Sequence, residues 1–451
     1  MKNLKLCWIA VLVAVFGLVL PLQAQNRSIL TSRNSSGISA TYSTTGSFDF
    51  NNPFFKSIGT NGRSCVTCHQ PSESWGISAE GVQKRFKETR GRDPIFRAVD
   101  GANCPNNARL GDARAYSQLL NKALIRIDRP LPANAEFRIE VTSDPYNCST
   151  PTDISVYRRP LPSTNLKFLS AVMWDGRETA PGKTILEDFL QQASDATTGH
   201  AQGLVPDAAT LQAIRAFETS IFTAQVFDRR AGILFVDGAK GGPIPLSQQD
   251  FFLGINDPLG GNPTGAAFDP KIFDIYKAWE NLPHDEDGVR AAARASVARG
   301  EQLFNSLPIP IFGVGGLNGP RDASQGVIPG TCGTCHDSPN AGNHSLSVPL
   351  DIGLTDVSRR TPDQPLFTLI NNTTGEVVHT TDPGRAMVSG KWKDIGKFKG
   401  PILRGLSGRA PYFHNGSAAT LLDAVNFYDS RFNLNLTPQQ KADLVAFLST
   451  L

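Results

Sequence analysis

The pattern C-x-x-C-H occurs twice in the chain, at residues 65–69 (CVTCH) and at residues 332–336 (CGTCH). Two thiols at this spacing can reach the two vinyl groups of one porphyrin as thioethers, and the histidine that follows lies beneath the iron as a ligand. The alternative is one zinc ion held by all four cysteines, which leaves both histidines without a role. We therefore predict two covalently attached c-type haems, with His69 and His336 as iron ligands. The predicted attachment residues are Cys65, Cys68, Cys332 and Cys335.

The first 24 residues have the pattern of a secretory signal peptide. Lys2 and Lys5 are followed by an apolar run over residues 8–20, and Ala24 provides a small residue at the expected cleavage site. We therefore predict that residues 1–24 are removed on export and that the mature protein is periplasmic. Loss of the two lysines lowers the formal charge from +3 to +1, which gives no electrostatic reason to bind nucleic acid. No later stretch is apolar and long enough to predict a membrane span.

Two further cysteines, Cys104 and Cys148, lie in a polar region rich in Pro and Asn. In an oxidising compartment such a pair favours a disulfide. The alternative interpretation is two buried thiols.

Apolar periodicity and capping residues predict three helices. One begins after Asp207, a capping residue, and repeats apolar side chains at helical spacing over residues 211–221. A second, rich in Ala and Arg, covers Val289–Phe304. The last begins at Thr437, where the residues Thr-Pro-Gln-Gln form a capping box with proline in the first turn. Because strand signals are sparse, we predict a mostly α fold.

The two motifs divide the chain into two cytochrome c-like haem domains with long loop insertions, as a duplicated module would. Residues 25–60 are rich in Ser, Thr, Asn and Gly and are expected to form an extended arm with little core. The insertion is expected to contain few regular elements. The expected division is an N-terminal haem domain at 25–228 with an insertion at 75–157, a connecting or inserted segment at 229–285, and a C-terminal haem domain at 286–451.

Four further segments are typical of one protein family. Together with the haem motifs, and in this order, they resemble the bacterial di-haem cytochrome c peroxidases and their MauG-like relatives, over roughly residues 50–70, 160–228 and 290–451. The segments are residues 173–177 (MWDGR), Ala213–Phe227, residues 403–406 (LRGL) and residues 410–416 (APYFHNG).

The resemblance implies a division of labour between the haems. The haem on His69 would bind H₂O₂ at an open distal face, and the haem on His336 would be six-coordinate and would pass electrons to it. Trp174 falls where the family places a tryptophan between the two haems, so its indole would relay electrons. The alternative role of Trp174 is that of an ordinary core residue.

Two departures from the family pattern concern the iron ligands. Residues 70–90 contain no histidine, whereas the peroxidases carry one there that caps the resting iron, so we expect a five-coordinate N-terminal haem that needs no reductive activation. Tyr428 replaces the methionine ligand of the C-terminal haem, which is similar to the His/Tyr pair of MauG-like proteins. Tyrosinate is a hard donor that favours Fe(III). The alternatives are that Tyr428 is a core residue and that Met387 or His379 is the ligand.

The third departure concerns a calcium ion that these relatives hold between the domains, with an asparagine side chain as one ligand. Arg159 falls at that position, and Arg409 lies near the other ligands. These two arginines weaken the expectation of calcium.

Cleavage of the O–O bond needs a group that takes a proton from the bound peroxide and returns it to the leaving hydroxide. The family's glutamate has no counterpart in residues 191–200. We expect His200 to act as this acid–base group, with Asp195 as the second candidate and a plain loop histidine as the alternative for His200.

The remaining histidines and arginines receive supporting roles. His414 is expected to bond a propionate or a backbone group beside the second haem. Arg177 and Arg404 are expected to pair with propionates, or else to be surface residues. His284 and His344, on polar loops, are expected to be inert.

Three functions are compatible with the pattern. The first is a peroxidase that reduces H₂O₂ with electrons from a small periplasmic cytochrome c or cupredoxin. The second is MauG-like oxidation of a partner protein or an organic substrate through a high-valent bis-haem state. The third is a di-haem electron carrier without peroxide chemistry, which the missing N-terminal distal ligand argues against.

Overall fold

The computed structural model of the chain describes residues 28–282 and 288–451. The predicted signal peptide and His284 lie outside these residues. Helices make up 32% of the part that the structure describes and strands 16%, so the prediction of a mostly α fold is not confirmed. The strands were missed because most are short and carry charged or hydroxyl side chains between their apolar ones. No helix in the described part of the chain is both long and apolar enough to cross a membrane.

The chain after residue 28 forms an antiparallel hairpin, and the expectation of an arm with little core is wrong. The hairpin extends an antiparallel sheet in the order β1-β2-β6-β7, which brings residues 221–228 next to the start of the described chain. Ser39 and Thr41, which share one face of β2, are buried there, and Ala40 on the opposite face is buried as well, so both faces of the strand are covered. The strands are β1 (Ile29–Arg33), β2 (Gly37–Ser43), β6 (Ile221–Asp228) and β7 (Gly232–Ile233).

Helices α3 (Ile185–Gly199) and α4 (Ala208–Ser220) complete the N-terminal block. The predicted start of α4 is confirmed, because the Asp207 side chain accepts a hydrogen bond from the backbone N–H of Thr210 at 2.7 Å. Helix α4 continues directly into β6.

The insertion after the first haem motif is a folded lobe, although few regular elements were expected. Its strand β4 buries Phe137 and Ile139 on one face, with polar residues between them. The predicted disulfide between Cys104 and Cys148 is confirmed, with a Cα–Cα distance of 5.5 Å. The elements of the lobe are α1 (Ala79–Thr89), α2 (Ser117–Lys122), β3 (Ile125–Pro130), β4 (Phe137–Ser143) and β5 (Asp153–Arg158).

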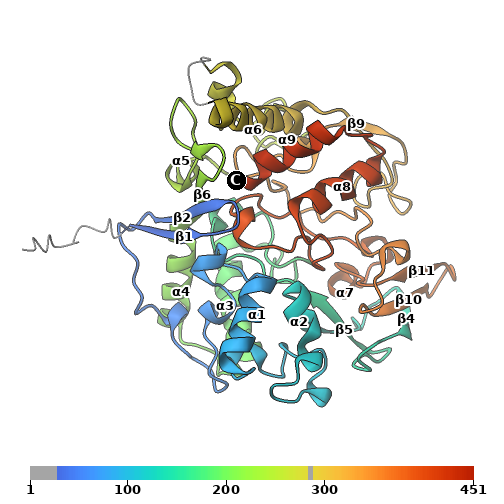
Figure 1. Cartoon of the computed structure of the whole chain (residues 1–451). Coiled ribbons are helices and arrows are strands. Elements are labelled where there is room, and N and C mark those ends of the chain that lie inside the picture. The colour runs from blue at the N-terminus through green and yellow to red at the C-terminus, as the bar shows by residue number, and fades with distance from the viewer. Residues whose placement is uncertain (1–27, 283–287) are drawn as a thin grey trace, which may run out of the picture.

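One sheet joins the two halves of the chain. Strand β4 of the insertion pairs with β10 (Leu366–Asn371), which also pairs with β11 (Val377–Thr380), all antiparallel. The three strands lie side by side at the right of Figure 1, next to α7 (Ala386–Ser389). The insertion is therefore a structural link between the halves.

Three helices of the C-terminal half, α6, α8 and α9, lie together at the top of Figure 1. The predicted second helix is confirmed as α6, and the predicted capping box of the last helix is confirmed at Thr437, whose side chain and that of Gln440 bond each other's backbone N–H. Tyr276 and Trp279, from the predicted connecting segment, pack in the same core as α6 and the last helix. The remaining elements are α5 (Pro243–Ser247), α6 (Gly288–Ser306), β8 (Ile309–Ile311), β9 (Ile328–Gly330), α8 (Leu421–Phe432) and α9 (Pro438–Ser449).

Candidate haem sites

Both C-x-x-C-H motifs fold as the same short turn. A single 3-10 turn covers Cys65–Thr67 in the first motif and Cys332–Thr334 in the second. In each, the backbone N–H of the histidine donates to the carbonyl of the first cysteine, at 3.0 Å for His69 and 3.1 Å for His336. The two turns therefore present two thiols and one imidazole in the same order, as expected for a duplicated haem-binding unit.

The imidazoles of the two motifs are held in the same way. Nδ1 of His69 lies 3.1 Å from the carbonyl oxygen of Trp75, and Nδ1 of His336 lies 2.7 Å from that of Gly342, six residues later in each case. A bond from Nδ1 to a carbonyl fixes the ring and leaves Nε2 as the ligand nitrogen. Burial lowers the pKa of His69 to about 4 and also lowers that of His336. Both rings are thus held neutral, as iron ligation requires.

The four motif cysteines are not joined by disulfides. Burial raises the pKa of Cys68 to about 11 and those of Cys332 and Cys335 to about 12, so the thiols are protonated at neutral pH. Within residues 28–282 and 288–451, no three His, Cys, Asp or Glu side chains gather as a metal site. Four separated thiols fit two thioether pairs better than the alternative of one zinc ion.

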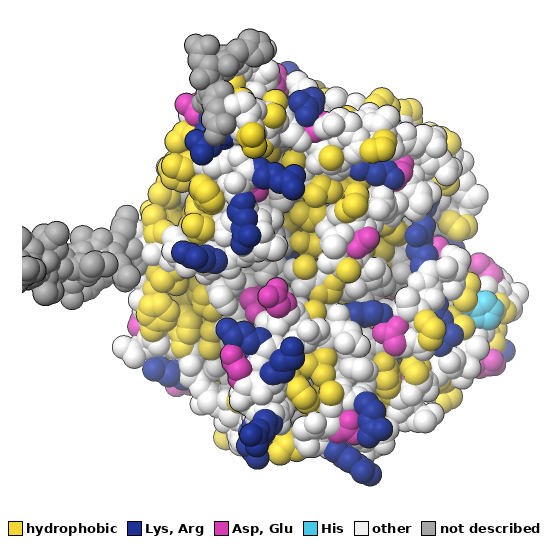
Figure 2. Space-filling model, viewed as in Figure 1, with side chains coloured by type: hydrophobic (Ala, Val, Ile, Leu, Met, Phe, Trp, Pro, Cys, Tyr) yellow, Lys and Arg dark blue, Asp and Glu magenta, His cyan; other side chains and the backbone are white. Residues whose placement is uncertain are grey.

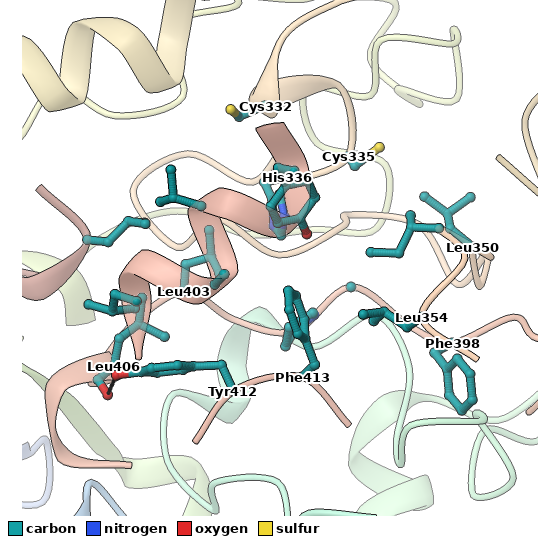
Figure 3. Close-up of a pocket in the computed structure, with 18 of the residues that line it drawn as sticks. Cys332, Cys335, His336, Leu350, Leu354, Phe398, Leu403, Leu406, Tyr412 and Phe413 are labelled. Atoms are coloured by element: carbon teal, nitrogen blue, oxygen red, sulfur yellow. Dashed lines mark hydrogen bonds between the residues drawn. The ribbon is translucent and has the colours of Figure 1, made fainter. Parts of the chain in front are cut away.

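The second motif forms one wall of an apolar cavity, which fits a porphyrin. Figure 3 shows Cys332, Cys335 and His336 on one side of the cavity, with Tyr412 and Phe413 facing them. Figure 2 shows a hollow near the middle of this face of the molecule, with hydrophobic side chains inside it. The labelled apolar side chains that complete the lining are Leu350, Leu354, Phe398, Leu403 and Leu406.

Of the three candidate sixth ligands, only Tyr428 lines this cavity. It lies on α8, and its ring packs against those of Phe413 and Phe432. Burial, with smaller contributions from the two nearby thiols, raises its pKa, so the phenol is neutral without a metal ion. Met387 is instead buried in a separate core beside Trp392, and His379 is exposed on β11. Neither alternative is placed to reach an iron bound by His336.

Trp174 and His414 meet at the edge of the cavity. The indole N–H of Trp174 donates to the carbonyl of Arg159 at 2.8 Å, and its ring lies 6.1 Å from that of His414. The His414 ring stacks on Phe398 at 3.9 Å, and its Nε2 is buried without a hydrogen-bond partner among the described residues. Burial lowers the pKa of His414 to about 4. A buried nitrogen without a partner in the protein fits a polar group on the ligand, as expected for a propionate.

His200 ends α3 and is tied to a buried carboxylate near the first motif. Its Nδ1 lies 2.5 Å from Asp100, which is also bonded by Arg63. Although burial opposes ionisation, the bonds from His200 and Arg63 lower the pKa of Asp100. Asp100 and Arg63 act electrostatically on Cys68, and His200 acts on His69. Asp100 could not be found from the sequence, because it lies 100 residues before its partner.

The second acid–base candidate, Asp195, is exposed on α3 and accepts a hydrogen bond from Gln191 at 2.9 Å. It has a neighbour that the sequence reasoning missed. Burial, together with the charge of Asp195, raises the pKa of Glu178 to about 7. Glu178 directly follows the MWDGR segment, which was the signal that could have identified it.

The remaining predicted residues have mixed outcomes. Arg177 bonds Asp175 at 3.2 Å within its own segment. Arg404 is buried beside a smaller pocket that adjoins the cavity. His344 lies on a loop, as expected, but it is 3% exposed, with Nδ1 3.3 Å from Asp337, the residue that follows His336.

The chain is similar in sequence to several cytochrome-c peroxidases, although no protein-family profile matches it. Cytochrome-c peroxidase IdrP1 of Pseudomonas sp. (strain SCT) is 31% identical over 140 residues, which are 27% of this chain and 36% of that protein. Cytochrome-c peroxidase IdrP2 of Denitromonas iodatirespirans is 31% identical over 132 residues, with the same two coverages. Cytochrome c551 peroxidase of Nitrosomonas europaea is 41% identical over 69 residues, 15% of this chain and 21% of that protein.

The chain thus spans about a third of the length of the first two of these relatives. Among solved structures, a MauG-like protein associated with microbial copper homeostasis aligns over 89% of this chain and 86% of that chain, with 16% identity and a TM-score of 0.40. Over the matched segments the chain is therefore similar to cytochrome-c peroxidases, which agrees with the presence of the two C-x-x-C-H motifs.

Proposed function

We propose that the chain is a periplasmic oxidoreductase with two c-type haems that reduces hydrogen peroxide at the haem of His69, with electrons relayed from the haem of His336. One observation carries the proposal. The two C-x-x-C-H motifs have the same turn and the same histidine hydrogen bond, but they have different neighbours. The first motif lies near the His200–Asp100 pair, and the second lines a cavity with the phenol of Tyr428.

The first site has what proton transfer to and from peroxide requires. When bound, haem supplies the iron that exchanges electrons with the peroxide. Asp100 holds Nδ1 of His200 and leaves Nε2 to take a proton from peroxide and return it to the departing hydroxide. Arg63 keeps Asp100 ionised, so the imidazole stays oriented. Reduction of one H₂O₂ to two waters consumes two electrons and two protons.

The second site is suited to holding and passing electrons. Tyr428 and His336 line the same cavity, so both would be available to hold the iron of a bound haem. Trp174 lines this cavity as well, and its backbone carbonyl accepts a bond from Lys399 at 2.8 Å. An oxidisable indole held this firmly can relay an electron to the first site.

A second candidate function is oxidation of a partner protein or an organic substrate. Tyr428 favours it, because a tyrosinate ligand stabilises ferric and higher oxidation states and so disfavours a simple supply of electrons. The periplasmic location is part of both proposals and is supported by the Cys104–Cys148 disulfide.

The test uses the full chain, exported in a bacterium that matures c-type cytochromes. A pyridine haemochrome assay should count two porphyrins per chain. Turnover of peroxide with a reduced small cytochrome c would support the peroxidase. A persistent change in the visible spectrum after peroxide, without such turnover, would support the second candidate. A protein that binds neither peroxide nor cyanide would be an electron carrier and would contradict both.

A further inference from the structure

Three basic residues line the cavity together with Trp174, and a fourth lines an adjoining pocket. Arg159, Lys399 and Arg409 line the cavity itself, and Arg404 lines a smaller pocket that shares Lys399 and Arg409 with it. Lys399 is 6% exposed and Arg404 is 3% exposed. We call Arg159, Lys399, Arg404 and Arg409 the basic cluster.

The basic cluster has no carboxylate partner. In the described parts of the chain, no ion pair within 4.0 Å involves any of its four members. The guanidinium groups bond backbone carbonyls instead: Arg159 reaches Ile77 at 2.6 Å, and Arg409 reaches Ile402 at 2.8 Å. Nε of Arg404 and Nε of Arg409 are buried without any acceptor among the described residues. Carbonyl dipoles solvate these charges only in part, and buried charges without counter-ions are costly.

A neighbouring lysine shows that such a charge is paired elsewhere in this fold. Lys397, two residues before Lys399, is equally buried at 5% exposed. Its ammonium group lies 3.5 Å from Asp322 and 3.7 Å from Asp394. Lys399 has no such carboxylate within 4.0 Å among the described residues, and Lys399, unlike Lys397, lines the cavity.

Mutual repulsion adds to the cost of the unpaired charges. Burial, with the charge of Arg409, lowers the pKa of Lys399 to about 7 and that of Arg159 to about 9. The acidic groups that act on the cluster are remote: Glu73 on Arg159, and Glu301 on Arg404. Several cations held close together without an internal anion form a site that is complete only when an anion binds.

We infer that the basic cluster is a carboxylate-binding site, which takes the propionate groups of haem and repels a divalent cation. The inference rests on the proposed function, because it needs haem in the cavity. A porphyrin carries vinyl groups at one edge and two propionates at the opposite edge. Cys332 and Cys335 account for the vinyl edge, and the cluster supplies the cations that the other edge needs.

The test compares Lys399→Met with Lys397→Met in the haem-loaded protein. Removing a buried cation beside the propionates should stabilise ferric haem over ferrous haem, since the ferric form carries one more positive charge. We therefore expect Lys399→Met to lower the midpoint potential of one haem in spectroelectrochemical titration. Lys399→Arg should keep the wild-type potential, and Lys397→Met should not lower it.

Two results would overturn the inference: an unchanged potential in Lys399→Met, or an equal fall in Lys397→Met. A second measurement needs no variant. Calcium titrated into the wild-type protein should give no binding heat by calorimetry and no rise in thermal midpoint, and saturable calcium binding would contradict a cation-repelling site. Fewer than two porphyrins per chain in the pyridine haemochrome assay would contradict the proposed function as well. Two porphyrins per chain, together with an unchanged midpoint potential in Lys399→Met, would contradict this inference alone.

Discussion

Arg158 and Asp382 form a bidentate, buried ion pair between the two halves of the chain. Nε of Arg158 donates to one carboxylate oxygen at 2.7 Å and Nη2 to the other at 2.9 Å. Nη1 bonds Asp175 as well. Arg158 ends β5 in the insertion, and Asp382 follows β11 in the C-terminal half. Burial opposes the charge on Asp382, but Arg158 lowers its pKa below the usual value.

We predict that Arg158→Met lowers the free energy of unfolding by about 3–5 kcal/mol, because it leaves Asp382 buried without its cation. Urea denaturation followed by far-UV circular dichroism measures the loss. The control is Lys391→Met, which breaks the half-exposed pair with Glu136 and should cost less than about 1 kcal/mol. Equal losses in the two variants would contradict the structural role of Arg158.

Tyr428→Phe should change the ferric visible and electron paramagnetic resonance spectra of one haem if Tyr428 holds the iron, since the variant removes the only oxygen of this side chain, which lines the cavity with His336. The matched control is Tyr412→Phe. Tyr412 lines the same cavity, but its hydroxyl donates to the carbonyl of Leu406 at 3.0 Å. If both variants keep the wild-type spectra, Tyr428 is not a ligand.

His200→Gln should slow the reaction with peroxide by about 10²–10⁴-fold, the usual contribution of a positioned acid–base group. Asp100→Asn should slow it by a smaller factor, because His200 remains but loses its orienting carboxylate. Stopped-flow mixing with peroxide measures both rates. His379→Gln, on exposed β11, serves as the control and should react at the wild-type rate. A wild-type rate in His200→Gln would assign proton transfer to another group, with Glu178 and Asp195 the next to be substituted.

The buried carboxyl of Glu218 on α4 should make stability fall as pH rises. Burial raises its pKa to about 8 from an ordinary value of 4.5. Between these values the unfolded chain releases a proton that the folded chain retains, so unfolding becomes easier with rising pH. In Glu218→Gln this dependence should be lost, and between pH 5 and pH 8 the variant should gain a few kcal/mol relative to wild type. Urea denaturation at the two pH values measures the difference.

Glu80→Gln is the control for Glu218→Gln, because Glu80 is exposed at the start of α1. Its pH dependence should match that of the wild type. A wild-type dependence in Glu218→Gln would mean that Glu218 is ionised in the fold.

Replacing both Cys104 and Cys148 by Ser should lower the free energy of unfolding by about 2–4 kcal/mol, because the bridge closes a loop with a sequence separation of 44. Mass spectrometry without reduction, on protein isolated from the periplasm, should find the two sulfurs joined. Two free thiols there would remove one support for the proposed location.

Local signals explain which parts of the fold could be predicted. The caps at Asp207 and Thr437 depend on residues within three positions, so the starts of α4 and α9 could be predicted directly. Strand β4 could not be predicted in the same way, because its partner β10 lies more than 200 residues later. Its alternating pattern has a meaning only once that partner is known.

The residues of the candidate sites also divide into those that a local sequence pattern marks and those that only the fold brings together. The residues predicted to attach the haems form contiguous motifs, so this prediction could be made from the sequence alone. Asp100 and Lys399 act through tertiary contacts, with His200 and with the cavity respectively, and no local pattern marks either of them. Tyr428, Met387 and His379 are all chemically competent ligands, so only the structure could show that Tyr428 alone of the three lines the cavity.

The pairing of β4 with β10 has a consequence for any attempt to divide the protein. A fragment that ends between the two haem motifs would leave the backbone N–H and C=O groups of β4 unpaired along a whole edge, and the complementary fragment would do the same to β10. Neither half is therefore self-contained, and fragments that carry one C-x-x-C-H motif each should aggregate through these unpaired strands.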